Sequence, residues 1–257
     1  MLAQALGLEQ ARLVAVCGGG GKTSLLFALG HEWHRASERV LLTTTTHIAA
    51  AQAEGHEAWV GADARTLLAR ACRSDASLVV ATAGPAQAPE KLRGLAPDEV
   101  DVLAGHGRFT RVLVEADGSK HRPLKAPAGH EPVFPMSTHA VVMVAGLAGL
   151  GRPLSEETVF RVERWTRITD SRPGDIVTPR ALAQVVLHEQ GLARGAPAGA
   201  KRVLLLNQAD DDERVANAAQ VHGWLGRLPG HCPERVVIAR LQPVPKVIRV
   251  LHFAPGD

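Results

Sequence analysis

The chain has 257 residues, 46% of them hydrophobic, and a formal net charge of +3, which is ample apolar material for the core of an α/β domain. No apolar run reaches the roughly 18–20 residues of a membrane-spanning helix, and no leader pattern begins at Met1, so we expect a cytoplasmic protein without membrane association. Dispersed charge, 4% aromatic residues and three widely spaced cysteines argue against nucleic-acid binding, a disulfide framework and a cysteine-based zinc site.

Short apolar runs, each flanked by polar or turn residues, predict β-strands. They span 12–17, 40–43, 78–81, 112–114, 140–144, 203–206 and 236–238. Because the runs are almost continuously apolar, they fit parallel strands that are buried on both faces. Helical patterns lie between several of them, at 22–36, 64–73, 155–166, 178–189 and 210–227. This alternation predicts an α/β fold with a doubly wound, mostly parallel sheet of the phosphate-loop (P-loop) NTPase type.

The domain organisation follows from the same pattern. We expect a single domain over residues 1–257 with a small helical insert at about 150–195. Ser155, followed by two glutamates, predicts a capped helix start, and Thr178 before a proline predicts another. The Gly- and Ala-rich residues 191–200 predict a loop.

The first strand runs into a glycine loop, Cys-Gly-Gly-Gly-Gly-Lys-Thr-Ser, at 17–24. Glycine allows backbone N–H groups to close around phosphate, Lys22 supplies a charge for the outer phosphates, and the Thr23 hydroxyl is suited to Mg²⁺. The usual pattern has a further glycine where this chain has Val16, and the alternative is a simple glycine-rich turn. The nucleotide-binding residues predicted here are Gly18, Gly19, Gly20, Gly21, Lys22, Thr23 and Ser24.

The second strand ends in four threonines, Thr43–Thr46. Their hydroxyls are expected near the ligand-facing edge of the sheet, and we include Thr45 among the candidate binding residues. Threonine is also common in strands, so a purely structural role is the alternative.

Two carboxylates, Glu115 and Asp117, follow the strand at 112–114. At the carboxyl end of a parallel strand, an acidic side chain can hold Mg²⁺ or orient a nucleophile. We expect Thr23 and Asp117 to hold the metal and Lys22, Glu115 and Asp117 to form the catalytic set. The alternative is a polar strand-to-turn junction.

A basic, proline-rich loop covers residues 116–135. Lys120 and Lys125 in this loop are candidates to bind an anionic acceptor or the phosphates of the nucleotide, and a solvated surface loop is the alternative.

The strand at 203–206 ends in Asn207-Gln208-Ala209-Asp210. In guanine-nucleotide enzymes an Asn-Lys-x-Asp turn reads the base, so Asn207 and Asp210 are candidate base-binding residues. Gln208 replaces the lysine, and both candidates could instead cap the next helix.

Several of these segments together resemble one family, the YqeC proteins, which are described as accessory proteins of selenium-dependent hydroxylases. The similar segments are the glycine loop, Leu41–His47, Val114–Lys120 with the basic loop to Val133, Gly151–Leu154 and the strand end at Asn207. The family pattern has His-Arg where this chain has Phe160-Arg161, and Asn-Lys-x-Asp where it has Gln208, which weakens an assignment to GTP.

The resemblance implies a nucleotide-binding protein that helps to mature molybdenum-containing hydroxylases. We therefore expect an Mg²⁺-dependent NTPase that binds ATP or GTP, with a molybdenum hydroxylase or its cofactor precursor as partner. One alternative is a Mur-like ATP-dependent ligase, because short Gly-Lys-Thr loops and Glu-Ala-Asp segments also occur there. The other is a delivery module that binds nucleotide without hydrolysing it.

Overall fold

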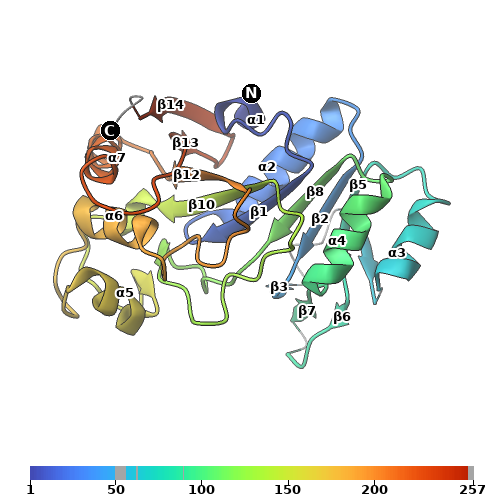
Figure 1. The fold of residues 1–257 in the computed structure, drawn as a ribbon, viewed down its shortest axis with the longest axis horizontal. Helices are drawn as coiled ribbons and strands as arrows, with labels where there is room; N and C mark the ends of the chain where they lie inside the picture. Colours follow the sequence, from blue (N-terminus) through green and yellow to red (C-terminus); the bar gives the residue numbers. More distant parts are fainter. Residues whose placement is uncertain (50–55, 62, 89, 254–257) are drawn as a thin grey trace.

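The computed structural model describes residues 1–49, 56–61, 63–88 and 90–253, and its centre is a nine-stranded β-sheet (Figure 1). The strand order is β14-β13-β12-β10-β1-β8-β2-β5-β4, and all neighbouring pairs are parallel except β13 and β14. The strands are β1 (Leu13–Gly18), β2 (Val40–Thr44), β4 (Glu57–Val60), β5 (Leu78–Thr82), β8 (Arg111–Glu115), β10 (Ala140–Gly146), β12 (Lys201–Asn207), β13 (Arg235–Arg240) and β14 (Lys246–His252).

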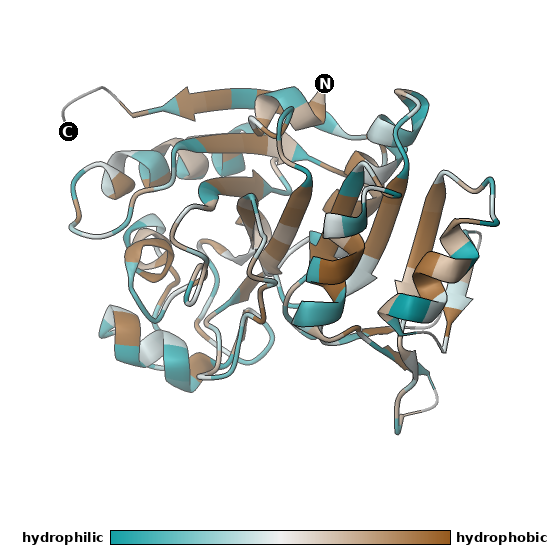
Figure 2. Ribbon diagram, turned by 45° about the vertical axis from the view of Figure 1, so that its right-hand side comes forward, coloured by the Kyte–Doolittle hydropathy of each residue, from teal (hydrophilic) through white to brown (hydrophobic). Residues whose placement is uncertain are grey.

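Helices cover both faces of this sheet, and the alternation of side chains along β1 shows how. Val14 and Val16 point to the face that carries α1 (Leu2–Ala5) and α2 (Lys22–Arg35). Leu13 and Cys17 point to the opposite face, where the remaining helices pack. These are α3 (Ala64–Ala71), α4 (Pro97–His106), α5 (Val162–Thr169), α6 (Pro179–Leu187) and α7 (Asp212–Leu225). The apolar strands between the two helical layers are visible in Figure 2, and the predicted α/β fold is confirmed.

All the predicted strands are present, and most predicted helices lie within a few residues of their expected bounds. The edge strands β4 and β14 were not predicted. All residues of β14 are exposed or half-buried, and it lacks a continuous apolar run. The helix start at Thr178 is confirmed, since its Oγ1 accepts a hydrogen bond from the Ala181 N–H at 3.1 Å.

The helix predicted at 155–166 is wrong in its first half. Ser155 begins a turn in which its carbonyl accepts hydrogen bonds from the N–H groups of Thr158 and Val159. The chain then forms a short strand, β11 (Val159–Phe160), and α5 starts only at Val162. Pairing with a distant strand therefore overrides the local capping signal.

That distant strand is β9 (Leu124–Lys125), which pairs in parallel with β11. The pair joins the loop after β8 to the segment before α5, and so builds one wall at the carboxyl edge of the main sheet. A second small sheet, β3 (His47–Ala49), β7 (Lys91–Arg93) and β6 (Gly84–Pro85), lies beyond the end of β2.

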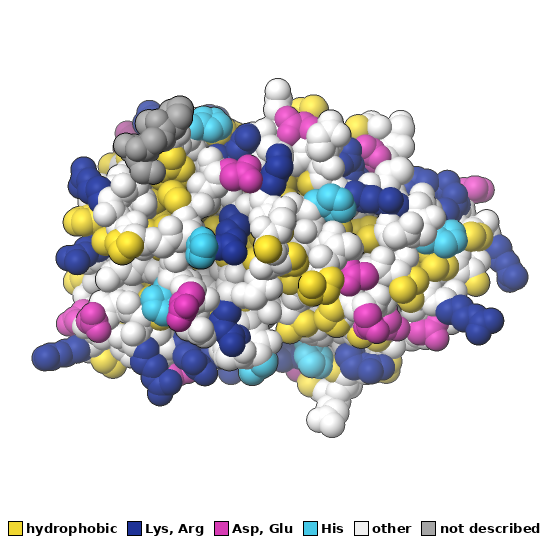
Figure 3. Space-filling model, in the orientation of Figure 1, with side chains coloured by type: hydrophobic (Ala, Val, Ile, Leu, Met, Phe, Trp, Pro, Cys, Tyr) yellow, Lys and Arg dark blue, Asp and Glu magenta, His cyan; other side chains and the backbone are white. Residues whose placement is uncertain are grey.

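The visible surface in Figure 3 carries basic and acidic side chains interspersed with one another. None of the helices in the described part of the chain has the length and apolar character required to cross a membrane.

Candidate functional site

The glycine loop connects β1 to α2 and needs glycine at several positions. Gly18, Gly20 and Gly21 have φ values of 102°, 77° and 130°, in the left-handed region that favours glycine. A Cβ on Gly18 would lie 2.1 Å from the Val144 carbonyl oxygen, and one on Gly20 would lie 2.5 Å from the Gly146 Cα. The loop therefore packs tightly against the end of β10, and it delivers the chain into α2 at Lys22.

A cavity of about 830 Å³ lies beyond the carboxyl ends of the central strands, against the glycine loop. Its wall includes many predicted residues: Gly20, Gly21, Lys22, Thr23, Ser24, Glu115, Lys120, Asn207 and Asp210. The other predicted residues are not part of this wall: Gly18, Gly19, Thr45, Asp117 and Lys125. The volume is in the range of ordinary ligand sites.

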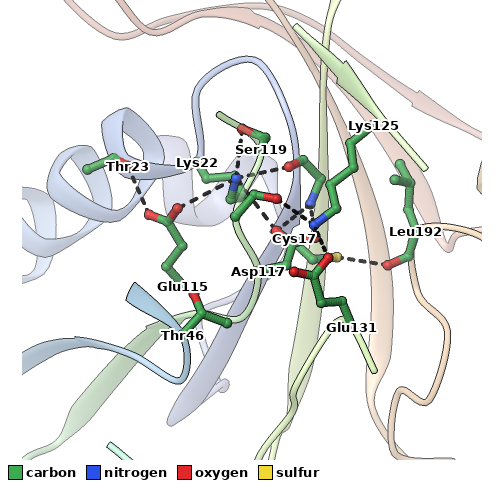
Figure 4. Close-up of polar contacts among 12 residues, drawn as sticks. Cys17, Lys22, Thr23, Thr46, Glu115, Asp117, Ser119, Lys125, Glu131 and Leu192 are labelled. Carbon is green, nitrogen blue, oxygen red and sulfur yellow. Dashed lines mark hydrogen bonds and ion pairs between the residues drawn. The ribbon is translucent and has the colours of Figure 1, made fainter. Parts of the chain in front are cut away.

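Three predicted side chains meet at the foot of the loop (Figure 4). The Thr23 hydroxyl donates a hydrogen bond to Glu115 Oε2 at 2.8 Å, and Lys22 Nζ lies 3.5 Å from Glu115 Oε1. Lys22 Nζ also donates to the Gly18 carbonyl at 2.9 Å and to Ser119 Oγ at 3.2 Å. The contact exists because β8 lies next to β1, which brings Glu115 beside the first turn of α2.

Lys22 is almost fully buried, and its charge depends on the acids around it. Burial works against the charged form, but Asp117 and Glu115 outweigh this effect and raise the pKa of Lys22 above its ordinary value. Lys22 is thus a cation at every physiological pH.

Asp117 lies behind the loop rather than in the cavity. Both of its carboxylate oxygens are 3.1 Å from the Gly18 N–H nitrogen, and Oδ2 is 2.9 Å from Lys125 Nζ. These contacts differ from the expectation that Asp117 holds a metal together with Thr23. Glu115 is the carboxylate that reaches both Thr23 and the cavity.

Lys125, which was expected to bind an anionic acceptor or the phosphates of the nucleotide, is also buried. Its ammonium group bonds to Glu131 Oε2 at 2.7 Å, in addition to Asp117, and Glu131 in turn pairs with Arg161. Burial alone would raise the pKa of Glu131, but hydrogen bonds from Arg161 and Lys125 lower it to about 2. The ammonium group of Lys125 is therefore already paired with the carboxylates of Asp117 and Glu131. It was expected to bind an anionic acceptor or a phosphate instead.

Cys17 lies at the end of β1, beneath this network. Its thiol donates a hydrogen bond to the Leu192 carbonyl at 3.1 Å. Burial and the neighbouring Asp117 raise the pKa of the Cys17 thiol well above its ordinary value. Cys17 is thus a neutral, packed side chain.

Asn207 lines the cavity, but its side-chain amide is bonded to the glycine loop and to the residue after β13. Its Nδ2 donates to the Gly20 carbonyl at 2.7 Å, and its Oδ1 accepts from the Leu241 N–H at 3.0 Å. Asp210 lines the cavity and pairs with Arg214. Two other cavity residues, Gln208 and Arg240, each have a buried polar atom, Oε1 and Nε, without a hydrogen-bond partner in the described structure.

Three of the four threonines at the end of β2, Thr43–Thr46, donate hydrogen bonds to backbone carbonyl groups. The hydroxyls of Thr43, Thr44 and Thr45 donate to the carbonyls of Ala81, Glu115 and Val133, at 2.7–2.8 Å. Thr45 therefore helps to hold the loop, and Thr46 lines the cavity in its place.

Some cavity residues could not be identified from the sequence. Lys91 is on β7, a three-residue strand without an apolar run, and Arg161 falls within the helix predicted at 155–166, although it lies between β11 and α5. Arg240 and Gln242 follow the central part of β13, where the only available signal is that the carboxyl ends of parallel strands share one edge.

The protein side chains at this site supply only some of the oxygen ligands that Mg²⁺ requires. Thr23 and Glu115 offer hard oxygen atoms, which Mg²⁺ prefers together with substrate phosphates. Over the ranges that the structure describes, no group of three or more His, Cys, Asp or Glu side chains is arranged to hold a metal ion. This arrangement suits a metal that arrives with a phosphorylated ligand.

Among solved structures, the chain is similar to FtsY from Mycoplasma mycoides in two crystal forms. The first comparison has 12% sequence identity and a TM-score of 0.38, and covers 96% of this chain but only 65% of the FtsY chain. The second, in space group H32, has 11% identity and a TM-score of 0.37, and covers 98% and 71%. At these scores the likeness supports no argument about function.

The sequence comparisons are stronger. Residues 14–163, which include the glycine loop, Glu115 and Arg161, match the family described as YqeC protein. A protein of Escherichia coli (strain K12), described as uncharacterized protein YqeC, is 32% identical over 237 residues, covering 92% of this chain and 90% of that protein. The chain belongs to the YqeC family.

Proposed function

We propose that this protein binds a nucleoside triphosphate together with Mg²⁺ in the cavity beside the glycine loop, and hydrolyses it. The observation that carries the proposal is the contact of Lys22, Thr23 and Glu115, with the Thr23 hydroxyl 2.8 Å from the carboxylate. A lysine, a hydroxyl and a strand-end carboxylate at one glycine loop are the groups that phosphoryl transfer requires.

Thr23 and Glu115 would hold the metal, because their oxygen atoms are adjacent and lie on the cavity wall. When bound, Mg²⁺ supplies positive charge that neutralises the phosphate oxygens. Glu115 thus takes the role that the sequence assigned to Asp117. Asp117 acts as a positioning residue, since it holds the Gly18 N–H and faces Lys22 and Lys125.

Lys22 would donate hydrogen bonds to the β- and γ-phosphates. Its present partners are the Gly18 carbonyl, Ser119 and two carboxylates, so phosphate oxygens would replace some of these contacts. Because the site is buried, each charge-assisted hydrogen bond is stronger than it would be in water. Positioning and charge neutralisation account for most of the catalysis in such sites.

The nucleoside would lie toward the ends of β12 and β13. Gln208 and Arg240 support this placement, because each has a buried polar atom that a ligand could satisfy. Asn207 would contribute by holding the loop, because the nitrogen and the oxygen of its side-chain amide are both already hydrogen-bonded.

The direct test is calorimetric titration of the protein with ATP and GTP, each with and without Mg²⁺, followed by a phosphate-release assay. We expect Mg²⁺-dependent binding of one nucleotide and slow turnover. Lys22→Ala should weaken binding about 10- to 100-fold, the effect of losing one or two charge-assisted hydrogen bonds. Lys201→Ala, exposed at the first position of β12 and so away from the carboxyl edge of the sheet, is the matched control and should leave the affinity unchanged.

Circular dichroism of Lys22→Ala is needed to show that the variant is folded. A folded Lys22→Ala protein that binds nucleotide as well as the wild type would refute the phosphate-site assignment. Tight binding with no measurable phosphate release would instead favour the nucleotide-switched delivery module.

We also propose that this activity serves the maturation of molybdenum-containing hydroxylases, including those that contain selenium. The support is the resemblance of Val114–Lys120 and the following basic loop to that group of accessory proteins. Deletion of the gene should lower hydroxylase activity and the molybdenum or selenium content of the hydroxylase without lowering its amount. Wild-type protein should restore both and Lys22→Ala should not; full activity in the deletion strain would contradict the proposal.

A further inference from the structure

The cavity extends to both sides of the glycine loop, and the strand order gives each side a different role. Glu115 is at the end of β8, on one side of β1, whereas β10, β12 and β13 follow on the other side. If Glu115 and Thr23 hold the metal, the terminal phosphate lies on the β8 side and the nucleoside on the β12 side. The rest of the cavity wall on the β8 side then lies next to the terminal phosphate, on the side away from the nucleoside.

That wall is formed by side chains from four separate segments: Thr46, His47, Lys91, Lys120, His121, Phe160 and Arg161. We call it the β8-side wall. Its residues come from the small β3–β7 sheet and the residue before it, from the loop after β8, and from β11 and the residue that follows it. None of them belongs to the glycine loop or to the ends of β12 and β13.

The charges on the β8-side wall are not balanced. In and around this wall, the cations Lys22, Lys125 and Arg161 are matched by the carboxylates of Glu115, Asp117 and Glu131, of which Glu115 and Glu131 also line the cavity. In the described part of the chain, neither Lys91 nor Lys120 has a carboxylate partner. Two positive charges therefore face the cavity without an internal counter-ion.

The backbone holds several of these side chains in unusual conformations. Lys120, His121 and Arg161 have φ values of 48°, 61° and 70°, which cost non-glycine residues roughly 1–2 kcal/mol each. Non-glycine residues held in this region concentrate at functional sites.

The position of Lys120 is fixed further by Phe160. The Lys120 ammonium lies 5.4 Å from the centre of the Phe160 ring, and the Arg161 guanidinium lies 4.5 Å from it. Phe160 belongs to β11, whose pairing with β9 ties this ring to the strand that follows the Lys120 loop. The lysine is thus presented to the cavity by a built wall.

We propose that the β8-side wall is a binding site for a second substrate, a small molecule that carries a phosphate or carboxylate group, next to the terminal phosphate of the nucleotide. Lys91 and Lys120 supply the charge, and His121 supplies a further hydrogen-bonding group. This inference rests on the proposed nucleotide site for its geometry. It replaces Lys125, which carboxylates occupy, with Lys91 as the second cation.

The test uses protein saturated with Mg²⁺ and a β,γ-imido nucleotide, so that the phosphate site is filled and cannot react. Inorganic phosphate and malonate are titrated separately at constant ionic strength, with chloride as the non-specific control. We expect saturable binding of at least one of the two probes. The double variant Lys91→Gln, Lys120→Gln should weaken it about ten-fold or more, and Lys246→Gln should not change it.

Equal affinity of the double variant and the wild type would overturn the proposal, as would the absence of saturable binding of either probe to nucleotide-loaded protein. Failure of the nucleotide site appears separately, as no binding in the loading step. In that case, phosphate and malonate are titrated into nucleotide-free Lys22→Ala protein, so that Lys22 cannot bind them. Binding that depends on Lys91 and Lys120 supports the site, and binding that does not, or no binding, overturns it.

Discussion

At the scale of single residues, the two carboxylates at the end of β8, two positions apart, differ in their contacts because only one of them belongs to the strand. Glu115 is the last residue of the strand and reaches Thr23 at the cavity. Asp117 is past the strand end and turns back to the Gly18 N–H. A carboxylate that accepts this N–H and an ammonium group stabilises the loop, whereas one at the cavity wall is available to a metal.

This division predicts the behaviour of Glu115→Gln. The amide can still accept the hydrogen bond from Thr23, but it lacks the charge that a metal requires. We expect nucleotide binding without Mg²⁺ to remain, the gain in affinity from Mg²⁺ to be lost, and turnover to fall about 100-fold or more. Titrations with and without Mg²⁺ measure the first two effects, and phosphate release measures the third.

Glu157→Gln, in an exposed turn, is the control for Glu115→Gln and should behave as the wild type. An Mg²⁺-dependent gain in affinity that survives in Glu115→Gln would show that another group holds the metal.

The sequence predicts those residues whose role depends on their neighbours in the chain. The glycine loop, Lys22 and Thr23 are in this class, since a strand, a loop and a helix start in order define them, whereas the sequence assigned the metal to Asp117 and not to Glu115. Lys125 is not in this class. Its burial depends on Glu131 and Asp117, and no sequence spacing reveals that contact.

At the scale of elements, the end of β12 joins two segments that are far apart in the chain. Asn207 links the glycine loop before α2 to the residue that follows β13, through Gly20 and Leu241. The glycine loop lies so close that a Cβ on Gly21 would be 2.2 Å from Asn207 Nδ2. The conformation of the loop therefore depends on the C-terminal half of the sheet.

Asn207→Ala should break this link. It leaves the Leu241 N–H and the Gly20 carbonyl unpaired, so we expect a loss of about 1–3 kcal/mol in the free energy of unfolding, together with weaker nucleotide binding. Asn207→Asp retains the acceptor for Leu241 but turns a carboxylate oxygen toward the Gly20 carbonyl, so it should be no more stable than Asn207→Ala and should also bind nucleotide more weakly than the wild type. Urea unfolding and nucleotide titration measure the effects.

Asn217→Ala, on helix α7, makes the same chemical change without these contacts and should leave both properties near those of the wild type. If Asn207→Ala were equally harmless, the link would not control the loop.

Elements were predictable where burial makes their pattern strong. The central strands are apolar on both faces, so their sequences predict strands directly. The edge strand β14 is exposed or half-buried throughout and has no continuous apolar run. The short strands β9 and β11 have two residues each, too few for any period. Such pieces exist because the surrounding fold aligns them, so their discovery requires the structure.

At the scale of the whole molecule, a chain of charges connects the glycine loop to the segment before α5. It runs from Lys22 through Asp117, Lys125 and Glu131 to Arg161. These residues come from separate elements and meet only when the sheet and the β9–β11 pair have formed. The network therefore belongs to the native state and gives folding a dependence on pH.

Glu131 determines the direction of that dependence. Its pKa is about 2 in the folded protein and close to 4.5 in the unfolded chain. Above pH 4.5 the carboxylate is charged in both states and its stabilising effect is fully present. As the pH falls from 4.5 toward 2, the unfolded chain takes up the proton first, and the stabilisation is progressively lost.

Glu131→Gln removes this titration and leaves Arg161 and Lys125 with less negative charge. We expect the variant to be less stable than the wild type at pH 7, by about 3 kcal/mol, as for removal of one partner from a buried ion pair. The difference should shrink as the pH falls below 4.5, because only the wild type loses the Glu131 contribution. Urea unfolding of both proteins between pH 7 and pH 3, with Glu157→Gln as the control, measures it. A difference that stays constant over this range would mean that Glu131 has the same pKa in both states, and that the network does not stabilise the fold through its charge.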